Sequence, residues 1–172
     1  MVLGGDGEPD PAGLRAIGQV IAKGNGFDAE AEAWVSPEVA AQRTAEEFGL
    51  RARISPRLRD REYGDWAGRR FEDLLTSEPG IQSWIASPEA APPGGESADD
   101  LIARAGSWLD DLAAEPDTAI RRTVVAVVHP TVVAALALRA IAGPSSGLRR
   151  LDIRPLTRVR LTARRGTWSL RL

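Results

Sequence analysis

The run of residues 123–128, Thr-Val-Val-Ala-Val-Val, is the feature that most constrains the fold of this chain. β-Branched side chains pack well on a pleated surface, and an unbroken run of them leaves no polar face to turn toward water. Such a strand is typical of the centre of a parallel sheet whose two faces are covered by helices. We therefore expect residues 123–128 to form a central strand of a parallel sheet.

Predicted strands and helices alternate through the rest of the chain, as their hydrophobic periodicity indicates. The helices are predicted at residues 11–23, 36–48, 71–75, 80–85, 97–113 and 130–141, and the other strands at 1–3, 31–35, 51–54, 159–162 and 167–170. Ser36 and Ser97 are the predicted caps of two of these helices. The order predicts a three-layer α/β/α fold with a mostly parallel central sheet.

Composition limits the class of protein. One domain is expected to span residues 1–172, because no interior linker appears and this length suits a single core. The absence of cysteine excludes disulfides and thiolate metal sites and favours a cytoplasmic location. No long apolar run or signal peptide is seen, so we expect no membrane partner. A formal net charge of -2 argues against nucleic acid, and the arginine-rich residues 149–165 are expected to be a solvated hairpin face.

Three loops are expected to meet at one edge of the sheet. In open α/β sheets, ligands bind beyond the carboxyl ends of the strands. The loops that follow predicted strands there are residues 4–8, Ser36-Pro37 and His129-Pro130. His129 is the only histidine of the chain. These loops therefore define one candidate crevice.

Five segments also resemble motifs of the histidine phosphatase (phosphoglycerate mutase-like) superfamily. Residues 36–45 resemble its Ser-Pro-Leu-x-Arg-Ala-x-Gln-Thr-Ala segment, and residues 58–68 resemble Leu-x-Glu-x-x-Phe-Gly-x-Trp-Glu-Gly. Residues 93–97 match Pro-x-Gly-Glu-Ser, and residues 124–133 resemble Val-x-Val-x-Ser-His-Gly-Gly-Val-Ile. The tail also resembles the family's closing strands. The resemblance implies a phosphoglycerate mutase-like fold, with residues 58–96 as an insertion over the crevice.

The resemblance implies a specific chemistry, and the chain departs from it. The family transfers a phosphoryl group to the histidine of an Arg-His-Gly motif, while arginines and a second histidine hold the phosphate. Here Gly5-Asp6-Gly7 stand at that motif, so Asp6 replaces the nucleophile. Ala40 replaces a pocket arginine, Asp60 stands at the position of the family's acid, and His129 matches the second histidine. A carboxylate in place of the nucleophile would repel a phosphate dianion.

We therefore predict a ligand-binding or regulatory pseudo-enzyme that has lost phosphohistidine chemistry, with a small molecule bound in the crevice. Whether any catalysis remains is open. Two alternatives keep it an enzyme: a crevice repurposed for acid–base chemistry on a non-phosphate substrate, or a weak or magnesium-dependent phosphatase with oxygen ligands from Asp6, Glu8 and Asp60. A homodimer also stays open, and no resident cofactor or metal is predicted.

The candidate catalytic residues are Asp6, Asp60 and His129, and the candidate binding residues are Gly5, Gly7, Ser36, Arg43, Glu96 and Trp66. Several have a structural alternative. Asp6 is equally consistent with a carboxylate that caps backbone N–H groups in a loop, and His129 with a buried, neutral side chain. For Glu96 we favour a hydrogen bond to the 58–68 loop or a helix-dipole role, and for Trp66 a core position.

Overall fold

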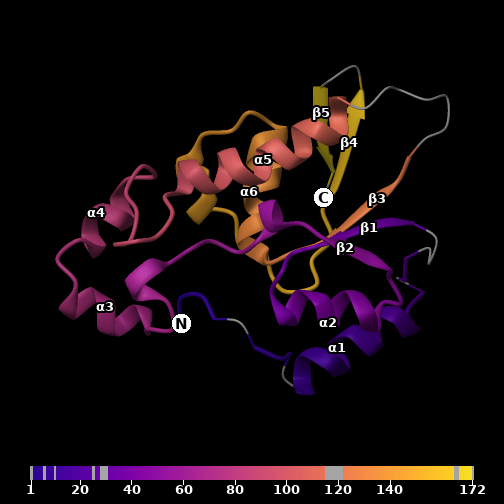
Figure 1. Ribbon diagram of the computed structural model, residues 1–172, viewed down its shortest axis with the longest axis horizontal. Helices are drawn as coiled ribbons and strands as arrows, with labels where there is room; N and C mark the ends of the chain where they lie inside the picture. Colours follow the sequence, from indigo (N-terminus) through magenta and orange to yellow (C-terminus); the bar gives the residue numbers. More distant parts are fainter. Residues whose placement is uncertain are drawn as a thin grey trace. The chain divides into compact units, whose positions relative to one another are not determined.

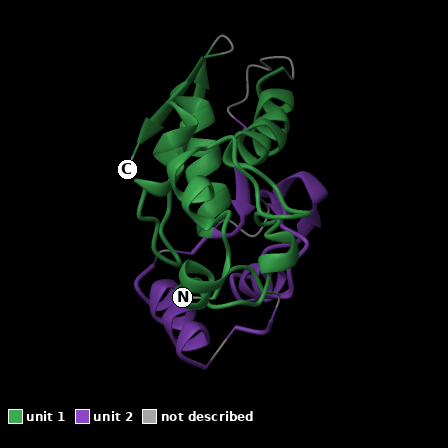
Figure 2. Cartoon of the chain, turned by 90° about the vertical axis from the view of Figure 1, so that its left-hand side faces the viewer, with its two compact units in different colours: residues 1–5, 60–115, 130–172 green, residues 6–59, 116–129 purple. Residues whose placement is uncertain are grey.

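The computed structural model describes residues 2–5, 7–9, 11–24, 26–27, 31–114, 122–164 and 167–171. They fold into two compact units, each built from segments that are far apart in the sequence (Figure 2). Unit 1 comprises residues 1–5, 60–115 and 130–172, and unit 2 comprises residues 6–59 and 116–129. The candidate residue Asp6 lies outside the described residues.

Unit 2 contains the predicted parallel sheet (Figure 1). Strands β1 (Glu32–Val35), β2 (Ala52–Ile54) and β3 (Val124–Val127) pair in the order β2-β1-β3, and both pairings are parallel. Helices α1 (Pro11–Ala22) and α2 (Val39–Glu47) and the short 3-10 helix Pro56–Leu58 complete the unit. Its core consists of small and branched apolar side chains: Ala33, Val35, Ala41, Ala45, Leu50 and Val125.

The central strand of the three is β1, which corrects the prediction for residues 123–128. In the described part of the chain, β3 pairs along one edge only, with β1. Of the β3 residues only Val125 is fully buried. The apolar run correctly predicted a parallel strand. It could not predict the neighbours of that strand, because apolar side chains report burial of the two faces and not pairing along the two edges.

The predicted strand at residues 1–3 is also wrong as a member of the parallel sheet. Val2 forms a single antiparallel bridge with Arg70, and Leu3 exchanges backbone hydrogen bonds with Arg69 and Gly68 at 3.0 and 2.8 Å. This places the start of the chain in unit 1. Leu3 is nevertheless 3% exposed, so its apolar side chain is buried as expected. Apolar character predicted burial here but not the partner.

Unit 1 is mainly helical. It contains α3 (Phe71–Ser77), α4 (Ile81–Ala86), α5 (Ala98–Ala114) and α6 (Pro130–Ala140), the 3-10 helices Gly64–Trp66 and Ser145–Arg149, and an antiparallel hairpin of β4 (Arg160–Arg164) and β5 (Thr167–Arg171). A second core of large side chains includes Leu3, Trp66, Leu74, Ile81 and Trp84. All of the predicted helices are therefore present, with ends shifted by a few residues.

The start of α5 confirms the predicted cap. The backbone N–H of Asp100 donates to the Ser97 Oγ at 3.0 Å, and the Ser97 hydroxyl and N–H donate to the Asp100 carboxylate at 2.7 and 3.2 Å. This reciprocal arrangement is a capping box closed by aspartate. The hydrogen bond from the Ser97 hydroxyl is the main reason why the pKa of Asp100 lies below its ordinary value.

No helix in the described ranges is both long and apolar enough to cross a membrane.

We expect Ser97→Ala to lower the free energy of unfolding by about 1 kcal/mol, because α5 loses its cap. The depressed pKa of Asp100 stabilises the fold above the ordinary pKa of an aspartate, and this contribution is lost as the pH falls through the lower folded-state pKa. The variant should therefore lose stability less steeply below pH ~4. Urea unfolding at neutral and acid pH measures both effects. Ser107→Ala, on the same helix, should change the unfolding free energy by less than about 0.5 kcal/mol.

Candidate functional site

The carboxyl ends of the parallel strands carry the first group of candidate residues. Ser36 directly follows β1, and His129 lies two residues beyond β3. The Ser36 N–H donates to the Val127 carbonyl at 3.1 Å, which continues the strand pairing past the end of β1. Ser36 and His129 therefore both lie where the two strands end in unit 2, as the rule for open α/β sheets predicts.

Ser36 does not cap α2, contrary to the prediction. The helix begins at Val39, and Glu38 is its N-cap residue, without a side-chain hydrogen bond to the helix. The Ser36 residue is 0% exposed, and its Oγ has no hydrogen-bond partner among the described residues. A Ser-Pro pair suggested a cap at Ser36, but Glu38 still has an extended backbone, with φ -68° and ψ 141°, and the helix begins after it. The buried hydroxyl is left as a polar group at the strand ends.

Glu38 is a member of this cluster that the sequence did not single out. Its Oε2 lies 3.9 Å from the His129 Nε2, and the two side chains are only 16% and 22% exposed. The distance is too long for a hydrogen bond and lies at the outer limit for an ion pair. The available signal was the motif itself, where Glu38 replaces an apolar leucine next to Ser36. We call Ser36, Glu38 and His129 the strand-end cluster.

Arg43 binds carboxylates on the surface of α2. Its Nη1 donates to Glu46 at 2.9 Å, and its Nε lies 3.3 Å from the Glu8 carboxylate. The hydrogen bond to Glu46 and the nearby charge of Glu8 raise the pKa of Arg43. The guanidinium is thus already neutralised by two acids, and its predicted role as a ligand contact stays a prediction. Gly5 belongs to unit 1 and Gly7 to unit 2.

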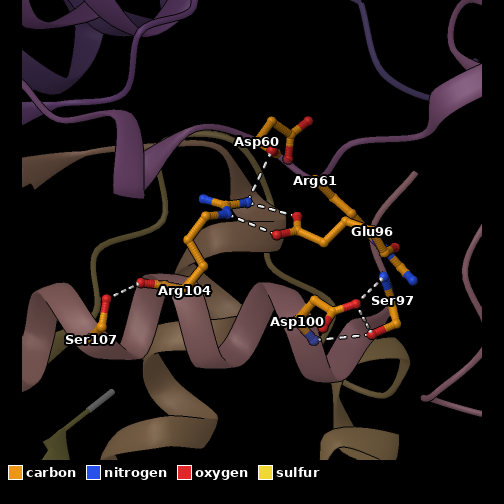
Figure 3. Close-up of polar contacts among 7 residues, drawn as sticks. All are labelled: Asp60, Arg61, Glu96, Ser97, Asp100, Arg104 and Ser107. Atoms are coloured by element: carbon orange, nitrogen blue, oxygen red, sulfur yellow. Dashed lines mark hydrogen bonds and ion pairs between the residues drawn. The ribbon is translucent and has the colours of Figure 1, made fainter. Parts of the chain in front are cut away.

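The second group of candidate residues forms a polar network in unit 1 (Figure 3). Arg104 on α5 donates its Nε and Nη2 to the two oxygens of the Glu96 carboxylate at 2.8 and 2.7 Å. Its Nη2 also lies 3.3 Å from the Asp60 carbonyl oxygen. The Glu96 and Arg104 side chains are 7% and 12% exposed. A bidentate, buried pair of this kind is well suited to fixing the geometry of a loop.

The backbone of Glu96 confirms its predicted contact with the 58–68 loop. Its N–H donates to the Glu62 carbonyl at 2.8 Å, and its carbonyl accepts from the Arg61 Nε at 2.9 Å. The bidentate partner Arg104 was missed, because it lies eight residues along the chain on the second turn of the helix. Asp60 contributes its carbonyl to the network, and its predicted role as an acid stays a prediction.

Trp66 is a core residue. It is 1% exposed and packs edge-on against Trp84, with ring centroids 5.6 Å apart. This is the core position favoured from the sequence.

Among the described residues, no group of three or more His, Asp or Glu side chains is placed to hold a metal ion.

The strand-end cluster has the chemistry of an acid–base pair. An imidazole and a carboxylate 3.9 Å apart can share or pass a proton with a bound molecule, and the buried Ser36 hydroxyl adds a donor and an acceptor. The Glu96–Arg104 pair of unit 1 is hydrogen-bonded through both carboxylate oxygens and serves to hold the 58–68 loop against the start of α5. The cluster is therefore the better candidate for ligand chemistry.

Residues 11–172 match the family described as histidine phosphatase superfamily (branch 1). A glucosyl-3-phosphoglycerate phosphatase of Mycobacterium tuberculosis is 35% identical over 106 residues, which are 56% of this chain and 46% of that protein. A 2,3-bisphosphoglycerate-dependent phosphoglycerate mutase of Azorhizobium caulinodans is 36% identical over 99 residues, or 52% and 47% of the two chains. The matched region thus spans about half the length of these curated relatives.

A solved structure gives the same fold over nearly the whole chain. The mycobacterial glucosyl-3-phosphoglycerate phosphatase in complex with VO3 superposes with a TM-score of 0.76 and 26% sequence identity. The superposition covers 97% of this chain and 86% of that one. This agrees with the predicted α/β fold and its mostly parallel central sheet.

Proposed function

The chain belongs to the histidine phosphatase superfamily (branch 1), and from that premise we propose that it is a ligand-binding member that does not turn over phosphate esters through a phosphohistidine. One observation carries the proposal: the 172 residues include a single histidine. Phosphohistidine chemistry, as the family resemblance implies it, needs one imidazole to receive the phosphoryl group and a second to hold it. His129 matches the second of these and has no counterpart in the chain.

Electrostatics at the strand-end cluster supports the same proposal. A phosphoryl group held against the His129 Nε2 would approach the Glu38 carboxylate, which lies 3.9 Å from that nitrogen. Two unit charges about 4 Å apart repel by roughly 4 kcal/mol at an effective dielectric constant of 20. Arg43 is paired with Glu46 and Glu8, so it offers little compensation. The cluster suits a ligand that presents a neutral polar or cationic group.

A second candidate function is phosphate-ester hydrolysis. It is favoured by the names of the relatives, a glucosyl-3-phosphoglycerate phosphatase and a phosphoglycerate mutase. In this chain such a reaction would have to use His129 and Glu38 as an acid–base pair that activates water, because no second histidine is present. The two candidates therefore differ in whether phosphate esters are consumed.

The test is hydrolysis of p-nitrophenyl phosphate by the purified chain and by its His129→Ala variant. We expect equal background rates and no acid-labile phosphoprotein. Turnover in the wild type that is lost in the variant would establish the second candidate and reject the first. Repeating the assay with a metal chelator shows whether any turnover depends on a metal ion.

A thermal-shift screen of neutral and cationic polar compounds tests ligand binding. We expect at least one compound to stabilise the wild type, and we expect this effect to be lost in both His129→Ala and Glu38→Gln. A screen that finds no such compound contradicts ligand binding at the cluster.

A further inference from the structure

A buried arginine of unit 1 has a hydrogen-bond donor to spare. Arg61 is 6% exposed, and its Nε donates to the Glu96 carbonyl at 2.9 Å. Its Nη2 is buried and has no hydrogen-bond partner among the described residues. Burial lowers the pKa of Arg61, although a guanidinium stays charged in a protein. A buried cation with an unused donor lowers the stability of the fold, because the donor has lost its hydrogen bonds to water and has no acceptor in their place.

A second arginine lies on the same indole ring. The Cζ of Arg149 is 3.8 Å from the centroid of Trp84, and that of Arg61 is 5.0 Å away. The Nη2 of Arg149 donates to the Trp84 carbonyl. Burial is the main cause that lowers the pKa of Arg149, and the charge of Arg61 lowers it further. Two cations that repel each other thus share one aromatic side chain.

Two of the carboxylates near Arg61 accept hydrogen bonds from other donors. Glu96 binds Arg104 through both of its oxygens, and Asp100 binds Ser97. These acids and Asp60 act on Arg61 through their charge, but none accepts a hydrogen bond from it in the described part of the chain. Among the described residues, both guanidinium groups therefore donate to backbone carbonyls and neither has a carboxylate hydrogen-bond partner.

Neighbouring groups provide what an anion would need besides charge. The ring of Tyr63 lies 6.0 Å from the Arg61 Cζ, and its centroid is 6.4 Å from that of Trp84. Burial is the main cause that raises the pKa of the Tyr63 phenol, so Tyr63 stays a neutral hydroxyl that can donate a hydrogen bond. Arg149 is exposed and connects this group of side chains to solvent.

We propose that Arg61 and Arg149, on Trp84 and beside Tyr63, form a binding site for the oxyanion group of a ligand, a carboxylate or a phosphate. A guanidinium fork matches the paired acceptors of such groups, and an anion bound at this site would satisfy the unused Arg61 donor and offset the repulsion between the two cations. The site lies wholly in unit 1 and goes beyond the proposed function, because it does not require His129 or Glu38.

The test is calorimetric titration of the chain with inorganic phosphate and, separately, with acetate, at constant ionic strength set by chloride. We expect saturable binding of at least one anion, and the stronger of the two identifies the class of ligand. Arg149→Gln should weaken that binding about tenfold or more. Arg150→Gln removes the same charge next to it in the sequence, and Arg53→Gln removes a guanidinium 5.8 Å from the ring centroid of Trp34; both should bind as the wild type does.

Two further variants keep the result interpretable. Arg61→Lys keeps the buried charge but not the fork, so it should also weaken binding while circular dichroism reports a folded chain. In His129→Ala the titration should be unchanged, which separates this site from the strand-end cluster. The inference is overturned if the wild type binds neither anion, if Arg149→Gln binds like the wild type, or if Arg150→Gln loses as much affinity as Arg149→Gln.

Discussion

Replacing Gly64 by alanine is expected to lower the free energy of unfolding by about 3 kcal/mol or more. Gly64 has a φ of +49°, a conformation that L side chains rarely adopt. A Cβ built on it would lie 2.0 Å from the Pro93 carbonyl oxygen and 2.6 Å from backbone atoms of Gly94 and Gly95. These contacts are to backbone, so no side-chain rotation can relieve them.

The close approach at Gly64 has a structural purpose. The Asp65 N–H donates to the Pro93 carbonyl at 2.9 Å, which ties the 58–68 loop to the loop before α5. A side chain at Gly64 would push these loops apart and break the tie. Chemical denaturation of the variant measures the loss. The control is Gly18→Ala in the middle of α1, where a Cβ meets nothing within 4 Å; it should stabilise the chain by about 0.5 to 1 kcal/mol. A Gly64→Ala variant as stable as the wild type would contradict the observed backbone contact.

Elements with a strong local signal could be predicted from the sequence. The cap residue Ser97 predicted the start of α5, and in the structure Asp100 closes a capping box with it. The helix predicted to end at residue 48 ends at Glu47, and Gly49, with a φ of +72°, follows its C-cap. In each case the residues that decide the structure are neighbours in the sequence. Their spacing alone therefore fixes the outcome.

Features that depend on partners distant in the sequence could not be predicted in the same way. The partner of Val2 is Arg70, and β3 pairs along one edge although its sequence is that of a central strand. The loop acid Glu96 was placed correctly against the 58–68 loop, yet its carboxylate binds Arg104 on the next helix. Apolar and charged residues show that a partner is needed, and tertiary packing decides which one it is.

The candidate site shows the same limit. The rule that ligands bind beyond the carboxyl ends of parallel strands selected Ser36 and His129, and both residues do follow neighbouring parallel strands, while their role in binding stays a prediction. The rule did not select Glu38, because the helix was predicted to start at Ser36 and Glu38 was therefore expected inside the helix and not in the loop. The helix starts at Val39 instead, and the Glu38 Oε2 lies 3.9 Å from the His129 Nε2. A shift of the helix start therefore changed the electrostatic character of the site.

Breaking the buried ion pair between Glu96 and Arg104 is expected to destabilise the chain by about 3 to 5 kcal/mol. Glu96→Leu leaves the Arg104 guanidinium 12% exposed and without its two carboxylate acceptors. Removing one partner leaves the other charge buried and without a counter-ion. This lowers the free energy of unfolding more than removing both charges does. The stability of Glu96→Leu in urea, compared with the wild type, measures this effect.

The double variant Glu96→Leu with Arg104→Met decides between two explanations of that loss. If the stranded charge is responsible, removing it should make the double variant clearly more stable than Glu96→Leu alone, although the hydrogen bond from Arg104 to the Asp60 carbonyl is lost as well. If the pair itself supplies the stability, Glu96→Leu has already lost it, and the double variant should be no more stable than Glu96→Leu alone. The exposed pair of Arg139 and Asp110, 2.6 Å apart with side chains 49% and 46% exposed, is the matched control. Asp110→Asn should change the unfolding free energy by less than about 1 kcal/mol. A similar loss in Asp110→Asn and Glu96→Leu would show that burial does not set the strength of these pairs, and the account of the unit 1 network would then be wrong.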